Sequence, residues 1–188
     1  YLILHRAELF FADKAIFIEG DTERILLPAM MKKIDCENSE NPLLSQNISI
    51  VEVGNYSQIF EKFIHFIGVK SLVITDIDSS KIITDINSGN SYKEKCPVND
   101  SEASITTNPS LKYFYESDKL DDFKSEKLED MIIYKDTKIN KWVKCKDGNL
   151  VCVYQTLEND YNARSFEDAF FHLNRKFIID KKDNFLRL

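Results

Sequence analysis

Carboxylates follow two apolar runs of this sequence at the point where each run ends. The run AIFI is followed by Glu19 and then by Glu23. The run LVIT is followed by Asp76 and Asp78. Acidic groups held close together repel one another unless a cation lies between them, and carboxylate oxygens without His or Cys favour Mg²⁺ or Mn²⁺ over Zn²⁺. The four acids therefore form a candidate site for a hard divalent cation.

Each of these acids has an ordinary explanation when it is taken alone. Glu23 falls near the start of an expected helix, where an acid favours the helix dipole, and Asp78 enters a polar loop. The joint pattern carries more weight, because Glu-Gly-x-x-Glu follows one strand and Asp-x-Asp follows another. A metal or catalytic site explains both motifs together.

Strands and helices alternate around these motifs. The apolar and capping patterns predict strands at 15–18, 48–53 and 71–80, and helices at 21–35 and 57–67. This order predicts an α/β fold with a parallel sheet. The carboxyl ends of parallel strands meet at one edge, so we expect the four acids to share one crevice there.

The second half of the chain is less regular. Residues 79–108 are polar, and we expect an insertion or mobile loop that lies away from the acids. Residues 141–156 predict a hairpin that turns at Asp147-Gly148, with a second arm at 150–155 that rejoins the sheet. Ser165 is a good helix start, with Phe166, Ala169, Phe170 and Leu173 expected on the buried face of that helix.

Composition narrows the class of protein. The chain has 188 residues, 43% of them hydrophobic and 30% charged, which is typical of one soluble domain. We expect a cytoplasmic fragment of a longer protein, since the chain opens at Tyr1 without a leader or a membrane-spanning run. The four cysteines are expected to be reduced. A net charge of −6 argues against broad DNA binding by this piece alone. If the protein acts on nucleic acid, metal ions or other domains must supply the positive charge that phosphate contacts need.

Five blocks of the sequence resemble a known family. The blocks are FFADKAIFIEGDTERILLP, VGNYSQIFEKF, LVITDIDSS, TTNPSLK and YNARSFEDAF. Together they resemble the Toprim domain of OLD-family (overcoming lysogenization defect) nucleases, a family that includes the nuclease subunit of the Gabija anti-phage system. The resemblance covers about residues 9–174 and departs mainly in the polar insertion at 79–108. It implies that residues 1–188 form one Toprim nuclease domain.

The resemblance implies a metal-dependent DNA endonuclease that uses two Mg²⁺ or Mn²⁺ ions. For the full-length protein, the resemblance implies an N-terminal ABC-type ATPase domain and assembly into a homo-oligomer, with a helicase-like partner subunit. It also implies a role in anti-phage defence without attachment to a membrane. This chain has no Gly-x-x-x-x-Gly-Lys-Ser/Thr motif, so we expect no ATP site within it.

Site residues follow from the matching positions. The resemblance implies Glu19, Asp76 and Asp78 as catalytic residues. The implied metal ligands are Glu19, Glu23, Asp76, Asp78, Glu167 and Asp168. Arg164 is a candidate for phosphate contact. The basic catalytic residue of the family cannot be matched here, and none of Arg175, Lys176, Lys181 and Lys182 is assigned to it.

Two other functions remain open at this point. In the first, DIDSS is the motif of a haloacid-dehalogenase-like phosphatase with Asp76 as nucleophile, although that motif would then follow an unexpected strand–helix unit. In the second, the acids are structural and the chain is a non-catalytic assembly module. The three histidines, at positions 5, 65 and 172, are scattered and are not expected to be catalytic.

Overall fold

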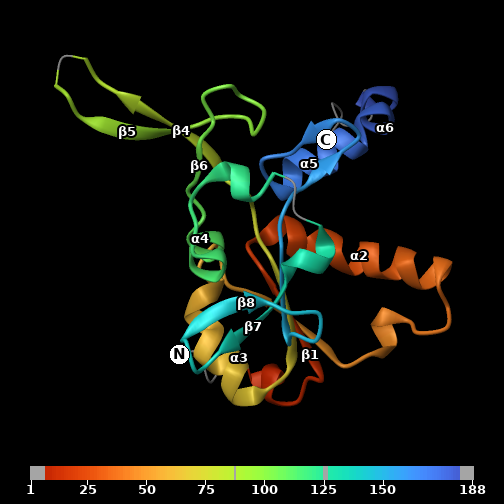
Figure 1. The fold of residues 1–188 in the computed structure, drawn as a ribbon. Coiled ribbons are helices and arrows are strands. Elements are labelled where there is room, and N and C mark those ends of the chain that lie inside the picture. Colours follow the sequence, from red (N-terminus) through yellow and green to blue (C-terminus); the bar gives the residue numbers. More distant parts are fainter. Residues whose placement is uncertain (1–6, 87, 125–126, 183–188) are drawn as a thin grey trace.

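A six-stranded mixed sheet forms the centre of the fold. The structure is a computed structural model that describes residues 7–86, 88–124 and 127–182 (Figure 1). The strand order is β2-β1-β3-β9-β7-β8. The strands of this sheet are β1 (Lys14–Ile18), β2 (Ile48–Glu52), β3 (Lys70–Ile74), β7 (Ile132–Asp136), β8 (Lys141–Lys144) and β9 (Leu150–Val153). Strands β1, β2, β3 and β9 run parallel to one another, whereas β7 is antiparallel to both β8 and β9.

The β1–β3 unit has the parallel connectivity that the sequence predicts. Helix α2 (Asp21–Glu37) links β1 to β2, and helix α3 (Glu61–Ile67) links β2 to β3. Because β2 and β3 flank β1 on opposite sides, right-handed crossovers place the two helices on opposite faces of the sheet (Figure 1). The prediction of a Toprim-type α/β fold is confirmed.

The core lies between this sheet and the segments that cover it. Phe17, Val51, Val73, Leu150 and Cys152 are all fully or almost fully buried, and they come from four neighbouring strands, with Leu150 and Cys152 both on β9. Burying such apolar side chains contributes on the order of 1.5–3 kcal/mol each. The carboxyl ends of β1 and β3 are therefore fixed relative to each other by packing as well as by the hydrogen bonds between the two strands.

The segment 79–108 is not the loop that its composition suggests. It forms an antiparallel hairpin of β4 (Ser79–Thr84) and β5 (Ser91–Lys95), and β6 (Ile105–Thr106) pairs with the root of β4. Figure 1 shows the hairpin projecting from the rest of the fold. The prediction of a mobile loop was wrong because the backbone hydrogen bonds of a two-stranded ladder hold these strands, which bury little side-chain surface. The segment also begins beside the acids, directly after Asp78.

The expected hairpin at 141–156 is also wrong in its pairing. Strand β8 pairs with β7, and β9 joins β3 and β7 instead of β8. The chain passes close to β7 at Gly148, where an added Cβ would lie 2.4 Å from Ile133 O. Glycine thus lets the chain cross from one side of β7 to the other. The prediction that the second arm rejoins the sheet is confirmed by the parallel pairing of β9 with β3.

Short helices complete the fold. They are α4 (Pro109–Tyr115), α5 (Phe166–Leu173) and α6 (Arg175–Asp180), together with the two-stranded ladder of β10 (Leu157–Glu158) and β11 (Tyr161–Asn162). The predicted start of α5 is confirmed, because Ser165 Oγ accepts a 3.3 Å hydrogen bond from the Asp168 amide.

The predicted buried face of α5 is wrong. Leu173 is 56% exposed, and no residue of α5 is fully buried. The helix packs on α2 along one side only, so its apolar residues are half covered (Figure 1). Within the described ranges, no helix has the length and apolar character that a membrane span requires.

Candidate functional site

Glu19 and Asp76 meet at the carboxyl edge of the sheet. Phe17 of β1 is in register with Val73 of β3, so the residues that follow the two strands emerge side by side. The Asp76 amide donates a hydrogen bond of 3.1 Å to Glu19 Oε1. The expectation that the acids of both strands lie at one edge therefore holds for this pair.

Two further side chains fix the position of Glu19. The Thr75 hydroxyl donates a hydrogen bond to Glu19 Oε1, and Asn108 Nδ2 donates to the same oxygen at 2.8 Å. Asn108 is fully buried and also donates to Thr75 Oγ1 at 2.9 Å. Its own carbonyl oxygen accepts from the amides of Ser110 and Leu111 at the start of α4. Oε1 of Glu19 is thus held by a buried network, while Oε2 accepts no hydrogen bond from any described residue.

Asp76 is held from the opposite side. Its Oδ1 accepts 2.8 Å hydrogen bonds from Gln155 Nε2 and from the Phe166 amide at the start of α5. Burial, followed by the charges of Glu19 and Asp78, raises the pKa of Asp76 to about 7 despite these donors. An acid in this state is stabilised by any cation that lies beside it.

Glu23 lies close enough to Glu19 and Glu167 to feel the charge of both. Glu23 is 3% exposed, and its Oε2 accepts a 3.1 Å hydrogen bond from the Gly20 amide. Burial raises the pKa of Glu23, and the charges of Glu167 and Glu19 add to that shift. A hydrogen bond with the Thr22 side chain lowers the pKa of Glu167. Helices α2 and α5 therefore bring these two acids into electrostatic contact.

Asp78 is ion-paired in this structure. Its Oδ1 lies 2.9 Å from Arg164 Nη2, and Arg164 Nε donates a 3.1 Å hydrogen bond to the Ser79 carbonyl. The backbone of Asp78 is left-handed, with φ of 48°, and its carbonyl accepts from the amide and hydroxyl of Thr107. Arg164, which was a candidate for phosphate contact, instead neutralises Asp78 here.

Asp168 has a structural environment. Both of its carboxylate oxygens accept 2.9 Å hydrogen bonds from the Tyr161 hydroxyl, and Oδ2 also accepts from the Arg164 amide at 2.9 Å. These bonds tie the β10–β11 ladder to the start of α5. The surroundings of Asp168 account for its presence without a metal ion.

The arrangement fits a hard cation in its chemistry. Glu19, Glu23, Asp76 and Glu167 supply only carboxylate oxygens, and two of these groups have raised pKa values because of burial and neighbouring acids. Within the described residues, however, no three His, Cys, Asp or Glu side chains converge closely enough to form a complete coordination sphere. Side-chain movement of these acids would accompany binding.

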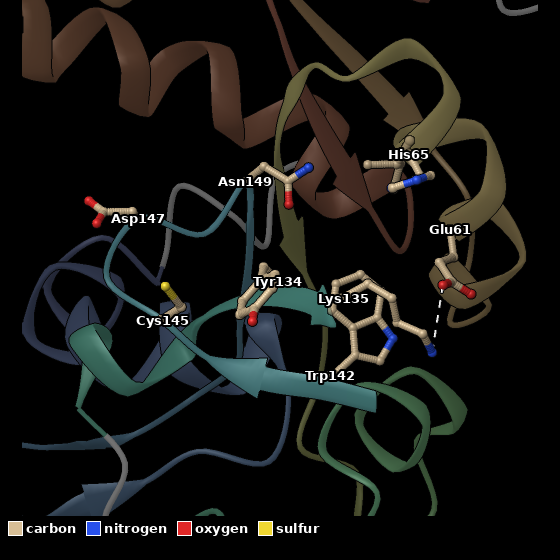
Figure 2. Close-up of a pocket in the computed structure, with 9 residues that line it drawn as sticks. Glu61, His65, Tyr134, Lys135, Trp142, Cys145, Asp147 and Asn149 are labelled. Atoms are coloured by element: carbon tan, nitrogen blue, oxygen red, sulfur yellow. Dashed lines mark ion pairs between the residues drawn. The ribbon is translucent and has the colours of Figure 1, made fainter. Parts of the chain in front are cut away.

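A separate cavity lies away from these acids. It has a volume of about 400 Å³ and is lined from α3, β7, β8 and the residues before β9 (Figure 2). Asn149, which precedes β9, marks it as lying toward the amino edge of the parallel strands, opposite Asp76. Figure 2 shows Lys135 directed at Glu61, whose Oε1 is 3.8 Å from Nζ. This cavity contains none of the predicted site residues and is not the candidate site.

Three residues of the site were not identified from the sequence. They are Thr75, Asn108 and Gln155, and each donates a hydrogen bond to a candidate acid that is far away in the sequence. Their side chains carry no charge, so their residue types alone did not indicate a role in the site. Thr75 directly precedes Asp76, and Asn108 falls in the block TTNPSLK, so position within the motifs was the available signal. Of the histidines, His5 lies outside the described residues.

Comparisons with known proteins agree with this geometry. Residues 10–78 match the family model of the TOPRIM domain of overcoming lysogenization defect protein-like proteins. The chain is 30% identical over 172 residues to Endonuclease GajA of Bacillus cereus (strain HuB5-5). That alignment covers 90% of this chain and 21% of the relative, so the chain spans about a fifth of that protein's length. No solved structure matches the chain.

The matched segment contains the β1–α2–β2–α3–β3 unit and the motifs that carry Glu19, Glu23, Asp76 and Asp78. The GajA alignment extends the similarity to nearly the whole chain. Residues 10–78 therefore carry a Toprim domain of the OLD-like kind, within a chain that is similar to Endonuclease GajA along most of its length.

Proposed function

We propose that this domain is the catalytic part of a metal-dependent DNA endonuclease. The observation that carries the proposal is the contact between Glu19 and Asp76, which brings two acids from adjacent parallel strands together and leaves Asp76 with a pKa of about 7. Such crowding is unfavourable without a cation. The name of the relative, Endonuclease GajA, supports the cleavage of nucleic acid.

Glu19, Glu23, Asp76, Asp78 and Glu167 would hold the cations, with Mg²⁺ or Mn²⁺ as the ions that suit carboxylate oxygens. When bound, such ions supply Lewis-acid stabilisation of phosphodiester oxygens and a more acidic water. The Asp168 carboxylate, which already accepts bonds from Tyr161 and Arg164, is assigned to positioning α5 and not to binding an ion.

The residues of the chain have distinct roles in this proposal. Thr75 and Asn108 orient Glu19, and Gln155 and the Phe166 amide orient Asp76. Asp76 can hold a proton on its carboxylate near neutral pH, which it would release when a cation enters. Arg164 balances the charge of Asp78. Pre-organised groups of this kind lower the reorganisation that accompanies the reaction.

The full-length protein provides the test. We expect it to nick supercoiled plasmid DNA with Mg²⁺ or Mn²⁺ and to lose this activity with EDTA. Glu19→Gln removes the charge with little change of shape, so nicking should fall by at least a hundredfold. Glu37→Gln is the matched control, because Glu37 is exposed at the far end of α2, and it should retain activity.

Nicking that survives Glu19→Gln would refute the assignment of this site. Loss of nicking in Glu37→Gln would indicate that the effect is general and not local. We also propose, from the family resemblance, that the full-length protein couples this domain to an ABC-type ATPase in a homo-oligomer, with a helicase-like partner subunit, and acts in anti-phage defence. Plaque formation by phage on cells that carry the Glu19→Gln protein or its parent tests that role.

A further inference from the structure

The projecting β4–β5 hairpin has two chemically different faces. In an antiparallel ladder, residues directly opposite each other share a face, and the faces alternate along each strand. The register pairs Ser80 with Lys95, Ile82 with Lys93, and Thr84 with Ser91. These three pairs form one face, which we call the lysine face.

The lysine face has positive charge and no acid. Lys93 and Lys95 are exposed, and neither forms an ion pair with any described residue. The opposite face is mixed, because Glu94 lies opposite Lys81, and Lys81 is paired with Glu102 at 3.0 Å. Charge is therefore concentrated on one side of the hairpin, in a chain whose net charge is −6.

The hairpin is anchored at the candidate site. Strand β4 begins at Ser79, the residue after Asp78, and the Ser79 carbonyl accepts hydrogen bonds from Arg164 Nε and from the Cys96 amide. Both strands of the root are thus joined to the loop that carries Asp78. Figure 1 shows the hairpin extending outward from this point. A ligand held along the hairpin would lie next to the acids.

The dimensions and chemistry fit duplex DNA. Six residues of β4 extend roughly 20 Å at about 3.4 Å per residue, and the major groove, about 12 Å wide, admits a two-stranded ribbon. Lys93 and Lys95 suit phosphate, and Ile82, which lies directly opposite Lys93 and is 54% exposed, suits an apolar contact with a groove wall. A clustered pair of free lysines is the feature that phosphate binding requires.

We propose that the lysine face of the β4–β5 hairpin binds the backbone of duplex DNA and guides it toward the acids. This inference rests on the proposed nuclease function, since DNA is the substrate in both. It adds a binding element that contains none of the candidate metal ligands.

The test uses full-length protein and a fluorescein-labelled 30-base-pair duplex. Binding is measured by anisotropy in Mg²⁺, in a Glu19→Ala background that prevents cleavage, at several salt concentrations. The variant Lys93→Ala/Lys95→Ala should weaken binding roughly tenfold and reduce the slope of log K against log[salt] by about 1.8, as expected for two lost phosphate contacts. Lys93→Arg/Lys95→Arg should restore both values.

The matched control is Lys62→Ala/Lys70→Ala, which removes the same charge from exposed lysines on α3 and at the amino end of β3. We expect this control to bind like its parent. Equal losses in the two variants, or no loss in the hairpin variant, would overturn the proposal. Plasmid nicking by the full-length protein without substitutions serves as the separate test of the proposed function. If that protein shows no metal-dependent nicking, the proposed nuclease function fails. If it nicks and Glu19→Gln does not, a negative binding result counts only against the hairpin.

Discussion

The side-chain amide of Asn108 donates a 2.8 Å hydrogen bond to Glu19, a residue 89 positions earlier in the chain. The carbonyl oxygen of the same side chain caps α4 through the amides of Ser110 and Leu111. One buried residue therefore connects the end of β1 to the start of a helix that lies outside the matched Toprim segment. This connection makes the position of Glu19 depend on a second part of the fold.

Two substitutions of Asn108 separate its roles. Asn108→Ala removes the cap and the bond to Glu19, and we expect the free energy of unfolding to fall by about 1–3 kcal/mol. Asn108→Asp keeps the capping oxygen but replaces the donor to Glu19 with another acid. It should lower plasmid nicking at least tenfold with a smaller loss of stability. Urea unfolding and nicking rates measure the two effects, and equal activity in Asn108→Asp and the parent would contradict a positioning role.

The raised pKa of Asp76 predicts a pH-dependent stability. The folded-state pKa is about 7, above the ordinary value of 3.8, so the folded protein binds a proton that the unfolded chain releases. This contribution is fully present below pH 3.8 and is lost as the pH rises through 7. Between pH 5.5 and pH 8, in EDTA, we expect the free energy of unfolding to fall by about 2 kcal/mol.

Asp76→Asn should remove most of that pH dependence, because the amide does not titrate in this range. Urea unfolding at a series of pH values gives both curves. A residual slope is expected from Glu23, whose pKa is also raised by burial. Parallel curves for the parent and Asp76→Asn would show that Asp76 does not titrate as described.

Divalent cations should stabilise the folded protein through this site. A ligand that binds only the folded state raises the melting temperature, by an amount that follows its concentration relative to its Kd. We expect Mn²⁺ to raise the melting temperature of the parent and to do so far less for Asp76→Ala. In the absence of metal, Asp76→Ala should remain folded, since removing one crowded acid relieves repulsion.

Asp168→Asn is the comparison for this experiment. The Asp168 carboxylate accepts hydrogen bonds from the Tyr161 hydroxyl and the Arg164 amide, so Asp168→Asn should lower the melting temperature. The increase of the melting temperature on adding Mn²⁺ should remain. Loss of that increase in Asp168→Asn would instead make Asp168 a ligand, as the family resemblance implies.

The pair of Arg164 and Asp78 should be energetically coupled. The two side chains are 21% and 22% exposed, and their charged atoms lie 2.9 Å apart as an ion pair without hydrogen-bond geometry. Ion pairs that solvent reaches contribute about 0.2–1 kcal/mol. We expect Arg164→Ala to destabilise the protein by an amount in that range, and Asp78→Ala to change stability less once Arg164 is absent. A double-mutant cycle measured by urea unfolding gives the coupling, and additive effects would contradict it.

The sequence was informative where apolar strands end in charge. The runs that became β1 and β3 are short, apolar and followed by acids, and the parallel unit places Glu19 and Asp76 at one edge, as predicted. The start of α5 at Ser165 was also predictable, because a capping side chain acts on its own neighbours.

Other features depend on contacts that local patterns do not encode. Strand β5 is exposed along its full length, so no alternation of buried and exposed residues marks it as a strand. The partner of β8 depends on the path of the chain around β7, and the bond from Asn108 to Glu19 depends on proximity in space. The ion pair between Asp78 and Arg164 likewise joins two residues that are far apart in the sequence.

The two ends of the segment between Asp78 and Asn108 are tied together. The Thr106 hydroxyl donates to the Ile77 carbonyl, and the Thr107 amide donates to the Asp78 carbonyl. The hairpin is therefore a closed excursion from the sheet, and residues added or removed at its exposed tip leave the separation of its ends unchanged. The length and charge of the hairpin can therefore change while the acids at its base keep their geometry.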